Sequence, residues 1–492
     1  MMASPVNPSR RSFLRLVAVS SLGVGGSALL SACGASNGST ANATGSVTAA
    51  APTTAAATTA ATKAATTAAA ATASASATAV PTAIPVKTGQ TLIEFWSGFG
   101  EADTNQTGIT AIKQMISDFQ AQNTKVVVQN IKVDYNNQLS EKLLTGIAAG
   151  TPPNTYYADR FLTATWAHKG IFTDLTPLNS KAGITAKDYL DFAWAEASWN
   201  GKQWVLPLDT DVRMLYINVD AAQQAGVDPT KPPQNTSDLL DWTTKLTKAD
   251  SSGNITQLGY WPTLGNCFHE IWMVNFGGKF FDSQANTCTA NDPNDIDAFT
   301  YMQSYAKRWG QKNVDAFIAA QPKGTENTAF YTGKLVSWVN GDWDLATIKK
   351  YKPDLKFTVS PIPGKTGPGS SMAGGWSLSI PTGAKNSDLG YQWIQYATGK
   401  EGLLTFCLGT SHIPTLQSIT NDPKLRADPN HNLFYDQLPK AWNRPVSIEA
   451  QTLWNDVGTA QKDVMSLKSD PKTALDFVVQ DVNAQLQMDS SK

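Results

Sequence analysis

All 15 tryptophans of this 492-residue chain lie beyond residue 90, which limits where a folded core can form. Residues 34–90 are almost entirely Ala, Thr and Ser; they contain no aromatic residue, and only Lys63 and Lys87 are charged. Such a segment cannot bury enough apolar surface to offset the entropy that it would lose on ordering. The sequence therefore predicts a disordered tether here, suited to O-glycosylation on threonine, and a folded part over residues 91–492.

The N-terminus has the order of elements found in an export signal. Arg10 and Arg11 precede a stretch of apolar and small residues that ends at Leu30. This stretch has about 15 residues, fewer than the ~20 that a membrane-spanning helix needs. It is followed by Ser-Ala-Cys33, and the Leu-Ser-Ala-Cys run resembles a bacterial lipobox. We predict a twin-arginine-like signal peptide over 1–32, lipidation of Cys33, and a lipidated cysteine plus tether over 33–90.

Removal of the signal peptide leaves a chain with little net charge. Residues 1–32 hold three arginines and no acid, so 39 basic and 40 acidic side chains become 36 and 40, a net charge of −4. This charge does not suit binding to nucleic acid or electrostatic attachment to a membrane. Nucleic acid is therefore not expected as a partner, and the membrane is expected to hold the protein only through the lipid.

Residues 91–153 alternate between strand and helix patterns. Apolar runs predict strands over 91–96 and 125–133, and apolar residues three and four positions apart predict a helix over 108–120. A helix over 139–149 is expected to end at Gly150. This alternation predicts an α/β fold with a mainly parallel sheet and a ligand at the carboxyl ends of its strands. Residues 91–492 are too many for one small core, so two lobes are expected.

The common catalytic and metal motifs do not occur in the sequence. The G-K-T run at 364–366 lacks the upstream glycine of a phosphate loop, and the H-E pair at 269–270 lacks the second histidine of a zinc helix. No G-x-S-x-G nucleophile motif is present. The acidic run at 292–297 lacks the glycine and distal glutamate of a calcium loop, and it is interpreted as the N-terminus of a helix. We therefore expect no cofactor and no metal.

Three cysteines lie in the predicted folded part. Cys267 and Cys288 flank a turn region at 276–281, and because an exported protein can hold a disulfide, a bridge between them is predicted. Cys407, between Phe406 and Leu408, is interpreted as a buried apolar residue.

The stretch WNGKQWVLPLDTDVRMLYINVD at 199–220, followed by AGVD at 225–228 and KPP at 231–233, resembles the signature of bacterial extracellular solute-binding proteins of family 1, the maltose-binding-like group. Five further segments are similar to motifs of this family: AAGTPPN at 148–154, KGIFTDLTPL at 169–178, FYTGK at 330–334, NGDW at 340–343 and GGWSLSIP at 374–381. The resemblance covers the chain after the tether. It implies a two-lobed periplasmic-binding-protein-like α/β fold of type 2, with three crossings between the lobes and a ligand cleft between them.

The resemblance also implies where the chain crosses. The crossings would fall near residues 209–213, 340–343 and 376–379. The first lobe would then comprise 91–208 plus 343–376, and the second 209–342 plus 377–492. Lobes joined by short crossings form a hinge that ligand binding closes.

Residues for a cleft can be chosen from the chemistry of sugars, whose apolar faces pack on aromatic rings and whose hydroxyls suit planar polar side chains. Loops at strand ends and crossings that mix these types supply the candidate ligand-binding residues: Trp96, Ser97, Phe99, Glu101, Asp159, Arg160, Asp209, Asp211, Trp261, Glu270 beside His269, Asp342, Trp343, Gly375, Trp376, His412 and Arg444.

Five of the candidates have a structural alternative. Asp209 and Asp211 could cap a bent strand, Trp261 could be core, His412 could bond the adjacent loop, and Arg444 could form a surface ion pair. Six further tryptophans on helical stretches are interpreted as core residues: Trp166, Trp194, Trp242, Trp309, Trp393 and Trp454.

The resemblance implies a monomeric, lipid-anchored protein on the outer face of the cell membrane. It would be the solute-binding component of an ABC importer, without enzymatic activity, delivering a sugar or oligosaccharide to the membrane-embedded permease subunits. One alternative is a binding protein for glycerol phosphate or another polar solute. The other is a secreted glycoside hydrolase, which would need two carboxylates about 5 to 9.5 Å apart.

Overall fold

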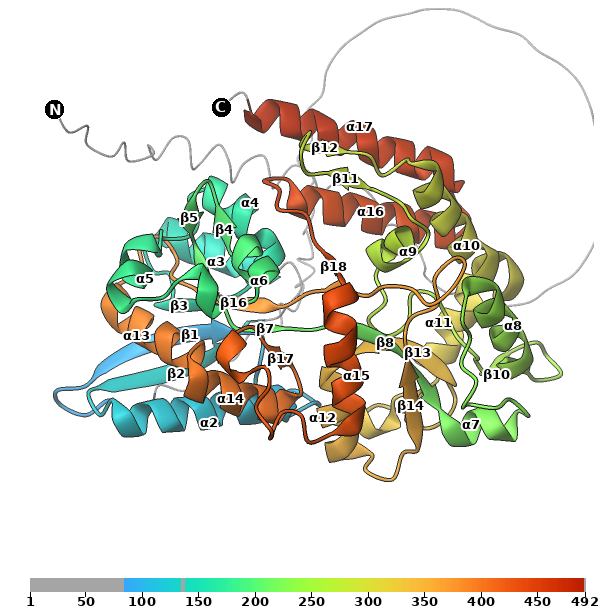
Figure 1. Cartoon of the computed structure of the whole chain (residues 1–492), viewed down its shortest axis with the longest axis horizontal. Helices are drawn as coiled ribbons and strands as arrows, with labels where there is room; N and C mark the ends of the chain where they lie inside the picture. Colours follow the sequence, from blue (N-terminus) through green and yellow to red (C-terminus); the bar gives the residue numbers. More distant parts are fainter. Residues whose placement is uncertain (1–83, 134–137, 491–492) are drawn as a thin grey trace, which may run out of the picture. The chain divides into compact units, whose positions relative to one another are not determined.

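The computed structural model describes residues 84–133 and 138–490, whose elements are shown in Figure 1. The predicted signal peptide, Cys33 and most of the predicted tether lie outside these residues. Within the described ranges, no helix combines the length and the apolar character needed to span a membrane.

Five strands form the sheet of the first lobe, in the order β2-β1-β3-β16-β6. They are β1 (Thr91–Ser97), β2 (Val126–Lys132), β3 (Thr155–Asp159), β6 (Val205–Pro207) and β16 (Trp376–Ser379). β1 runs parallel to β2 and β3, whereas β16 is antiparallel to β3 and β6. The predicted strands over 91–96 and 125–133 are confirmed. Their apolar runs fit a sheet that is covered on both faces.

Helices cover this sheet on both faces, with one apolar cluster on each. The helices of the first lobe are α2 (Thr107–Gln122), α3 (Gln138–Ala149), α4 (Thr163–His168), α5 (Thr176–Ala182), α6 (Asp191–Glu196), α13 (Ser387–Ala397) and α14 (Lys400–Thr410). α2 buries Ile109, Ile112, Met115 and Phe119, the apolar stripe that predicted it. Gly150 follows α3 with a φ of 73°, the left-handed conformation that commonly ends a helix.

Three strands form the sheet of the second lobe, in the order β13-β8-β14. They are β8 (Arg213–Asn218), β13 (Ser337–Gly341) and β14 (Phe357–Ser360). Both pairs are antiparallel, so the expectation of mainly parallel strands holds only for part of the first sheet. β8 lies within the stretch at 199–220 that carries the family resemblance.

Most of the remaining second lobe is helical. Its helices are α7 (Val219–Gln224), α8 (Thr236–Leu246), α9 (His269–Asn275), α10 (Pro293–Trp309), α11 (Gln311–Ala319), α12 (Trp343–Tyr351), α15 (Pro429–Gln437), α16 (Ala450–Met465) and α17 (Pro471–Ser490). The Asp292 side chain caps α10 by accepting a hydrogen bond from the Asn294 backbone N–H. The acidic run at 292–297 is therefore a helix start, as predicted.

Short elements connect these layers. They are β4 (Ser198–Trp199), β5 (Lys202–Gln203), β7 (Asp209–Thr210), β9 (Lys248–Ala249), β10 (Ile255–Gln257), β11 (Phe281–Asp282), β12 (Thr287–Cys288), β15 (Met372–Ala373), β17 (Ile413–Pro414), β18 (Trp442–Asn443), and the 3-10 turns Arg160–Leu162, Ala186–Asp188, Thr325–Asn327, Gln417–Ile419 and Leu438–Lys440.

The lobes are divided differently from the sequence-based expectation. Residues 343–376 were expected in the first lobe, but α12 buries Leu345 and Ile348 in the core of the second lobe, and β14 pairs with β8. Residues from 377 onward were expected in the second lobe, but β16, α13 and α14 pack in the first, with Trp393 and Phe406 in its core. The reason is that strand pairing and helix packing over long sequence distances, rather than local pattern, set the membership of a lobe.

Within the described residues the chain passes between the lobes in three places. The first, from β6 to β8 across 208–212, agrees with the expected crossing at 209–213. The second runs across 372–375 into β16, just before the expected 376–379. The third lies between Leu425, in the core of the first lobe, and Phe434 of α15, in the core of the second. Residues 340–343 are not a crossing, because both β13 before them and α12 after them belong to the second lobe.

The predicted disulfide is not formed. Cys267, Cys288 and Cys407 are all free and buried, as expected only for Cys407. Cys267 is buried beside Tyr260, whereas Cys288 lies on β12 and its thiol donates to the Phe280 carbonyl at 3.6 Å. Each thiol is thus held in its own local packing, which closeness in sequence could not reveal.

Candidate functional site

A cavity of about 340 Å³ lies between the lobes, and we call it the cleft cavity. Its lining residues come from both lobes and from the first two crossings: Phe99, Tyr157, Asp159, Asp211, Arg213, Asn266, Phe268, Trp343, Met372, Gly374, Gly375, Trp376, His412, Arg444 and Trp454. This volume is at the low end of the range for small-molecule sites. Two larger hollows, by α12 and α14 and by the β11–β12 hairpin, lack this combination of aromatic and ion-paired side chains.

Stacked aromatic rings form one wall of the cleft cavity. Tyr157 on β3 and Trp376 on the antiparallel strand β16 stack with ring centroids 4.7 Å apart and an angle of 15°. The Phe99 ring meets Tyr157 edge-on at 5.5 Å. Because β3 and β16 are paired, the sheet fixes the position of both stacked rings. A rigid aromatic wall of this kind suits the apolar face of a sugar.

Arg213, at the end of the first crossing, forms a second wall. Its guanidinium pairs with the Asp211 carboxylate, and its Nε donates to Asn266 Oδ1 at 3.0 Å. Asp211 Oδ1 also accepts from the Gly374 backbone N–H at 3.2 Å, which joins the first crossing to the second. The guanidinium lies 5.2 Å from the ring centre of Trp343. Charge pairing, a hydrogen bond and an aromatic ring therefore fix this arginine in one position.

Arg444 brings a second arginine into the cavity from the opposite lobe. The residue follows β18 and precedes α16, yet its guanidinium pairs with two carboxylates of the first lobe. Nη2 is 2.9 Å from Asp159 Oδ1 and 3.3 Å from Glu196 Oε2, and the guanidinium carbon lies 5.0 Å from the Phe161 ring centre. Its side chain is 5% exposed. The alternative of a surface ion pair is therefore wrong, because Arg444 and its partner Glu196 are both buried.

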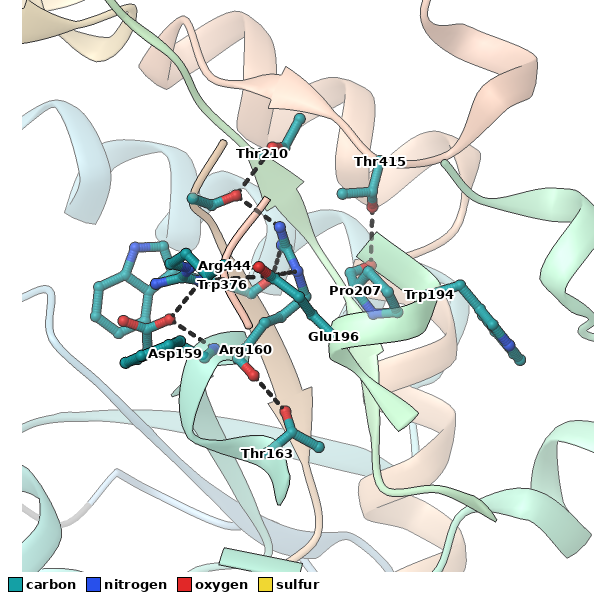
Figure 2. A network of polar contacts seen from close by, with 12 residues as sticks. Asp159, Arg160, Thr163, Trp194, Glu196, Pro207, Thr210, Trp376, Thr415 and Arg444 are labelled. Atoms are coloured by element: carbon teal, nitrogen blue, oxygen red, sulfur yellow. Dashed lines mark hydrogen bonds and ion pairs between the residues drawn. The ribbon is translucent and has the colours of Figure 1, made fainter. Parts of the chain in front are cut away.

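Arg160 acts behind the cavity, on the backbone of the first two crossings (Figure 2). It is 1% exposed, and its Nε donates to Glu196 Oε2 at 3.2 Å. Its other nitrogens donate to the carbonyls of Asp209, of Gly374 at 2.6 Å and of Trp376 at 3.1 Å. The guanidinium thus binds the two crossings to each other, and Arg160 is absent from the cavity lining.

The close approach of Arg160 requires glycine at position 375. A Cβ built on Gly375 would lie 2.3 Å from the Asp209 carbonyl oxygen and 2.5 Å from Arg160 Nη1. The φ of Gly375 is also 134°, which side chains rarely adopt. The second crossing therefore passes directly over the Arg160 guanidinium, and Gly375 lines the cleft cavity at this point.

His412 lies in a stack of rings beside the first crossing. Its imidazole is between Trp343, at 5.5 Å, and Phe406, at 5.7 Å, and both interplanar angles are 25°. Burial lowers the pKa of His412 to about 4, so the ring is neutral at physiological pH. Burial, followed by the nearby charge of Asp211, raises the pKa of Asp209 to about 7. His412 is thus an uncharged wall of the cavity.

Stability is expected to fall as the pH rises, because folding removes several carboxyl groups partly or fully from water. Burial raises the pKa of Asp209, Asp344 and Asp456 to about 7, and of Asp295 to about 8. Their pKa values in the folded protein exceed the ordinary value. The stability that these groups contribute is therefore fully present below about pH 4 and is lost as the pH rises through about 7 to 8. We expect the melting temperature to be several degrees lower at about pH 8.5 than at about pH 5. Scanning calorimetry checks this, and an equal or higher value at the alkaline pH would contradict it.

Half of the predicted ligand-binding residues line the cleft cavity: Phe99, Asp159, Asp211, Trp343, Gly375, Trp376, His412 and Arg444. The other half do not: Trp96, Ser97, Glu101, Arg160, Asp209, Trp261, Glu270 and Asp342. These two groups differ only in where the residues lie. Contact with a ligand remains a prediction for all of the first group.

The excluded residues have other structural positions. Trp96 is in a core of the first lobe, and its Nε1 donates to Glu94 at 3.2 Å. Ser97 donates to Asn130 at 2.6 Å, and Glu101 forms an exposed ion pair with Lys113.

The remaining excluded residues lie deeper. Trp261 is fully buried in the core of the second lobe, the alternative stated for it. Glu270 pairs with His269 at 3.1 Å, and Asp342 is fully buried before α12. Because β3 ends at Asp159, the adjacent Arg160 is directed away from the cavity that Asp159 lines.

Several residues that line or support the site are not among the predicted ones. Trp454 was interpreted as core because it lies on a helix, but it lines the cleft cavity and meets Phe268 edge-on at 4.8 Å. Tyr157 was not singled out, although it precedes Asp159 on the same face of a strand. Nothing in the local sequence distinguishes Asn266, Met372 or Glu196.

Comparison with known proteins gives matches over most of the folded part. The family model described as bacterial extracellular solute-binding protein matches residues 103–403. The maltotriose-binding protein of Pyrococcus abyssi is 22% identical over 349 residues, which are 68% of this chain and 70% of that protein. The chain is 25% identical over 310 residues to the sn-glycerol-3-phosphate-binding periplasmic protein UgpB of Escherichia coli (strain K12), covering 60% of this chain and 66% of that protein.

Solved structures share the fold. The structure of CpMnBP1 with mannotriose bound has a TM-score of 0.72 and 23% identity, and the match covers 80% of this chain and all of that one. Its likeness supports the two-lobed architecture described above. Since the family model spans more than half of the chain, the chain belongs to the bacterial extracellular solute-binding protein family.

Proposed function

We propose that this chain is the extracellular solute-binding component of an ABC importer and that it binds a neutral sugar or oligosaccharide in the cleft cavity. The main support is the pairing of charges around that cavity. Both arginines that line it have carboxylate partners, Arg213 with Asp211 and Arg444 with Asp159 and Glu196. The polar groups are thus arranged in compensated pairs beside an aromatic wall, which suits hydroxyls better than a charged ligand.

The charge pairing weighs against a phosphorylated ligand. A phosphate group carries up to two negative charges and needs cationic donors that are available to it. Here a phosphate would have to share Arg444 with Asp159, at 2.9 Å, and with Glu196, whose carboxylates already balance its charge. A glycerol-phosphate ligand is therefore the second candidate, supported by the UgpB relative.

The same pairing weighs against a glycoside hydrolase. A hydrolase needs a protonated carboxyl group to protonate the leaving oxygen. Asp159 and Asp211 are the acidic residues that line the cleft cavity, and each is engaged in an ion pair with an arginine rather than free to act on a glycosidic oxygen. The named relatives are binding proteins, which is also consistent with a protein that catalyses no reaction.

A carbohydrate panel tests the proposed ligand class. A neutral mono-, di- or trisaccharide that binds only the folded protein should raise its melting temperature, since ligand at ~100 times Kd adds about 2.7 kcal/mol. The same sugar should reduce the radius of gyration in solution scattering, because closure brings the lobes together. Glycerol 3-phosphate serves as the charged comparison. Stabilisation by glycerol 3-phosphate alone, or release of reducing sugar by the purified protein, would overturn the proposal.

We propose in addition that the chain is exported and held at the outer face of the membrane by a lipid on Cys33, where it acts as a monomer with the permease subunits. The Cys33→Ser variant should move the protein from the membrane fraction to the soluble fraction. The paired changes Arg10→Lys and Arg11→Lys should block export if the twin-arginine route is used. Immunoblots of cell fractions measure both, and normal export of the lysine variant would indicate the general secretory route.

A further inference from the structure

Glu196 is a buried carboxylate that two arginines share. It lies at the end of α6 in the first lobe and is 4% exposed. Oε2 accepts from Arg160 Nε at 3.2 Å and lies 3.3 Å from Arg444 Nη2, and Oε1 accepts from Arg444 Nε at 3.4 Å. Figure 2 shows the carboxylate with both arginines. Glu196 itself does not line the cleft cavity.

The two arginines connect Glu196 to different parts of the hinge. Arg160 belongs to the first lobe and bonds the carbonyls of the first two crossings. Arg444 belongs to the second lobe, since Trp442 before it packs on Phe280 and Leu453 after it is in the core of that lobe. A single carboxylate therefore joins the backbone of the crossings to a cleft-lining side chain of the other lobe.

We propose that Glu196 is a positioning residue that holds the second lobe against the first, by neutralising Arg444 in the closed cleft while it remains bound to Arg160. The inference deepens the proposed binding function and rests on it for the effect on affinity. When the lobes are together, Arg160 and Arg444 are both buried, and Glu196 separates their positive charges. When the lobes separate, Arg444 moves away with the second lobe, and Glu196 still neutralises Arg160.

This geometry predicts the sign of a charge-removing substitution. In Glu196→Gln the closed cleft would hold two buried arginines, with Asp159 as the carboxylate that still pairs with Arg444. Repulsion between the arginines would then disfavour the closed arrangement, whereas the open arrangement would keep Arg444 in water. Arg160 would lose its carboxylate partner in both the open and the closed arrangement. This loss should therefore lower the melting temperature without changing the balance between the two arrangements.

A double-mutant cycle separates the positioning role from a structural one. Arg444→Met removes the charge that Glu196 neutralises across the cleft. If Glu196 acts through Arg444, Glu196→Gln should shift the lobes apart in the wild-type background and have little effect in the Arg444→Met background. If it acts only through Arg160, the same change should appear in both backgrounds. Asp174→Asn is the matched control, because it removes a partly exposed ion pair with Lys202 at 3.1 Å in the same lobe.

The separation of the lobes can be measured without a sugar. Dyes on cysteines introduced at exposed Lys181 in α5 and Lys312 in α11, in the Cys33→Ser chain, report the distance by fluorescence energy transfer. We expect lower transfer for Glu196→Gln than for the parent or Asp174→Asn, and no further decrease when Glu196→Gln is added to Arg444→Met. Unchanged transfer in Glu196→Gln, or an equal decrease in both backgrounds, would overturn the inference.

Calorimetry with the saccharide identified in the panel gives the second readout. We expect Glu196→Gln to raise Kd about tenfold in the wild-type background and less than about twofold in the Arg444→Met background. Equal increases in both backgrounds would count against the positioning role. If no saccharide binds the parent protein, the proposed ligand class fails, while the energy-transfer result still decides the role of Glu196.

Discussion

Replacing Arg160 by methionine is expected to lower the free energy of unfolding by about 3 to 5 kcal/mol. The change would leave the buried Glu196 carboxylate without one of its two arginines and would remove the donor from three backbone carbonyls of the crossings. Unsatisfied buried groups carry their full desolvation cost, so the loss should exceed that of an ordinary surface arginine. Urea denaturation followed by circular dichroism measures it.

Two further variants show whether this loss has the expected cause. Arg160→Lys keeps the charge beside Glu196 but cannot reach all the carbonyls, so its loss should be intermediate. Arg308→Met removes an exposed arginine that lies over Trp309 at 5.1 Å, and its effect should stay within about 0.5 kcal/mol. If Arg160→Met were as mild as Arg308→Met, the guanidinium would not be what binds the crossings together.

The parts of the fold that could be predicted from sequence are those fixed by local pattern. The apolar spacing in α2 and the aspartate at the start of α10 each depend on residues within a few turns. The membership of β14, α13 and α14 in a lobe depends on partners more than a hundred residues away, as in the pairing of Val359 with Tyr216. No local pattern carries that information.

The candidate site shows the same limit at the level of single residues. Asp159 and Arg160 are neighbours with the same local signal, yet one lines the cleft cavity and the other binds backbone behind it. Successive residues at a strand end point to opposite sides, and the side that faces the cleft cavity is set by the neighbouring lobe. Trp454 was assigned to the core for a similar reason, since its helix is amphipathic but one part of it faces the first lobe. Glu196 could not be found at all, because its role depends on an arginine 248 residues later.

The charged residues near the crossings and the cleft cavity fall into two groups. Arg160 and Glu196 lie behind the cleft cavity and hold backbone and side chains in place, whereas Asp159, Asp211, Arg213 and Arg444 present polar groups at its surface. Paired in this way, the surface groups are fixed before a ligand arrives, which reduces the ordering cost of binding. Ring stacking then has to supply much of the contact energy, and this assigns the largest effect on affinity to Trp376.

Replacing Trp376 by alanine is expected to reduce affinity for the bound saccharide by at least about 2 kcal/mol, or roughly 30-fold in Kd. The indole is fixed on Tyr157 at 4.7 Å and lines the cleft cavity, so the variant would remove a preformed apolar wall. Isothermal titration calorimetry measures the loss. Trp194→Ala is the matched control, because Trp194 also stacks on a tyrosine, Tyr189 at 5.5 Å, but lies outside the cleft cavity. Its Kd should stay within about twofold of the parent, since contacts far from a ligand carry little binding energy. Equal losses in the two variants would indicate a general effect of removing a tryptophan, and an unaltered Kd in Trp376→Ala would place the ligand elsewhere.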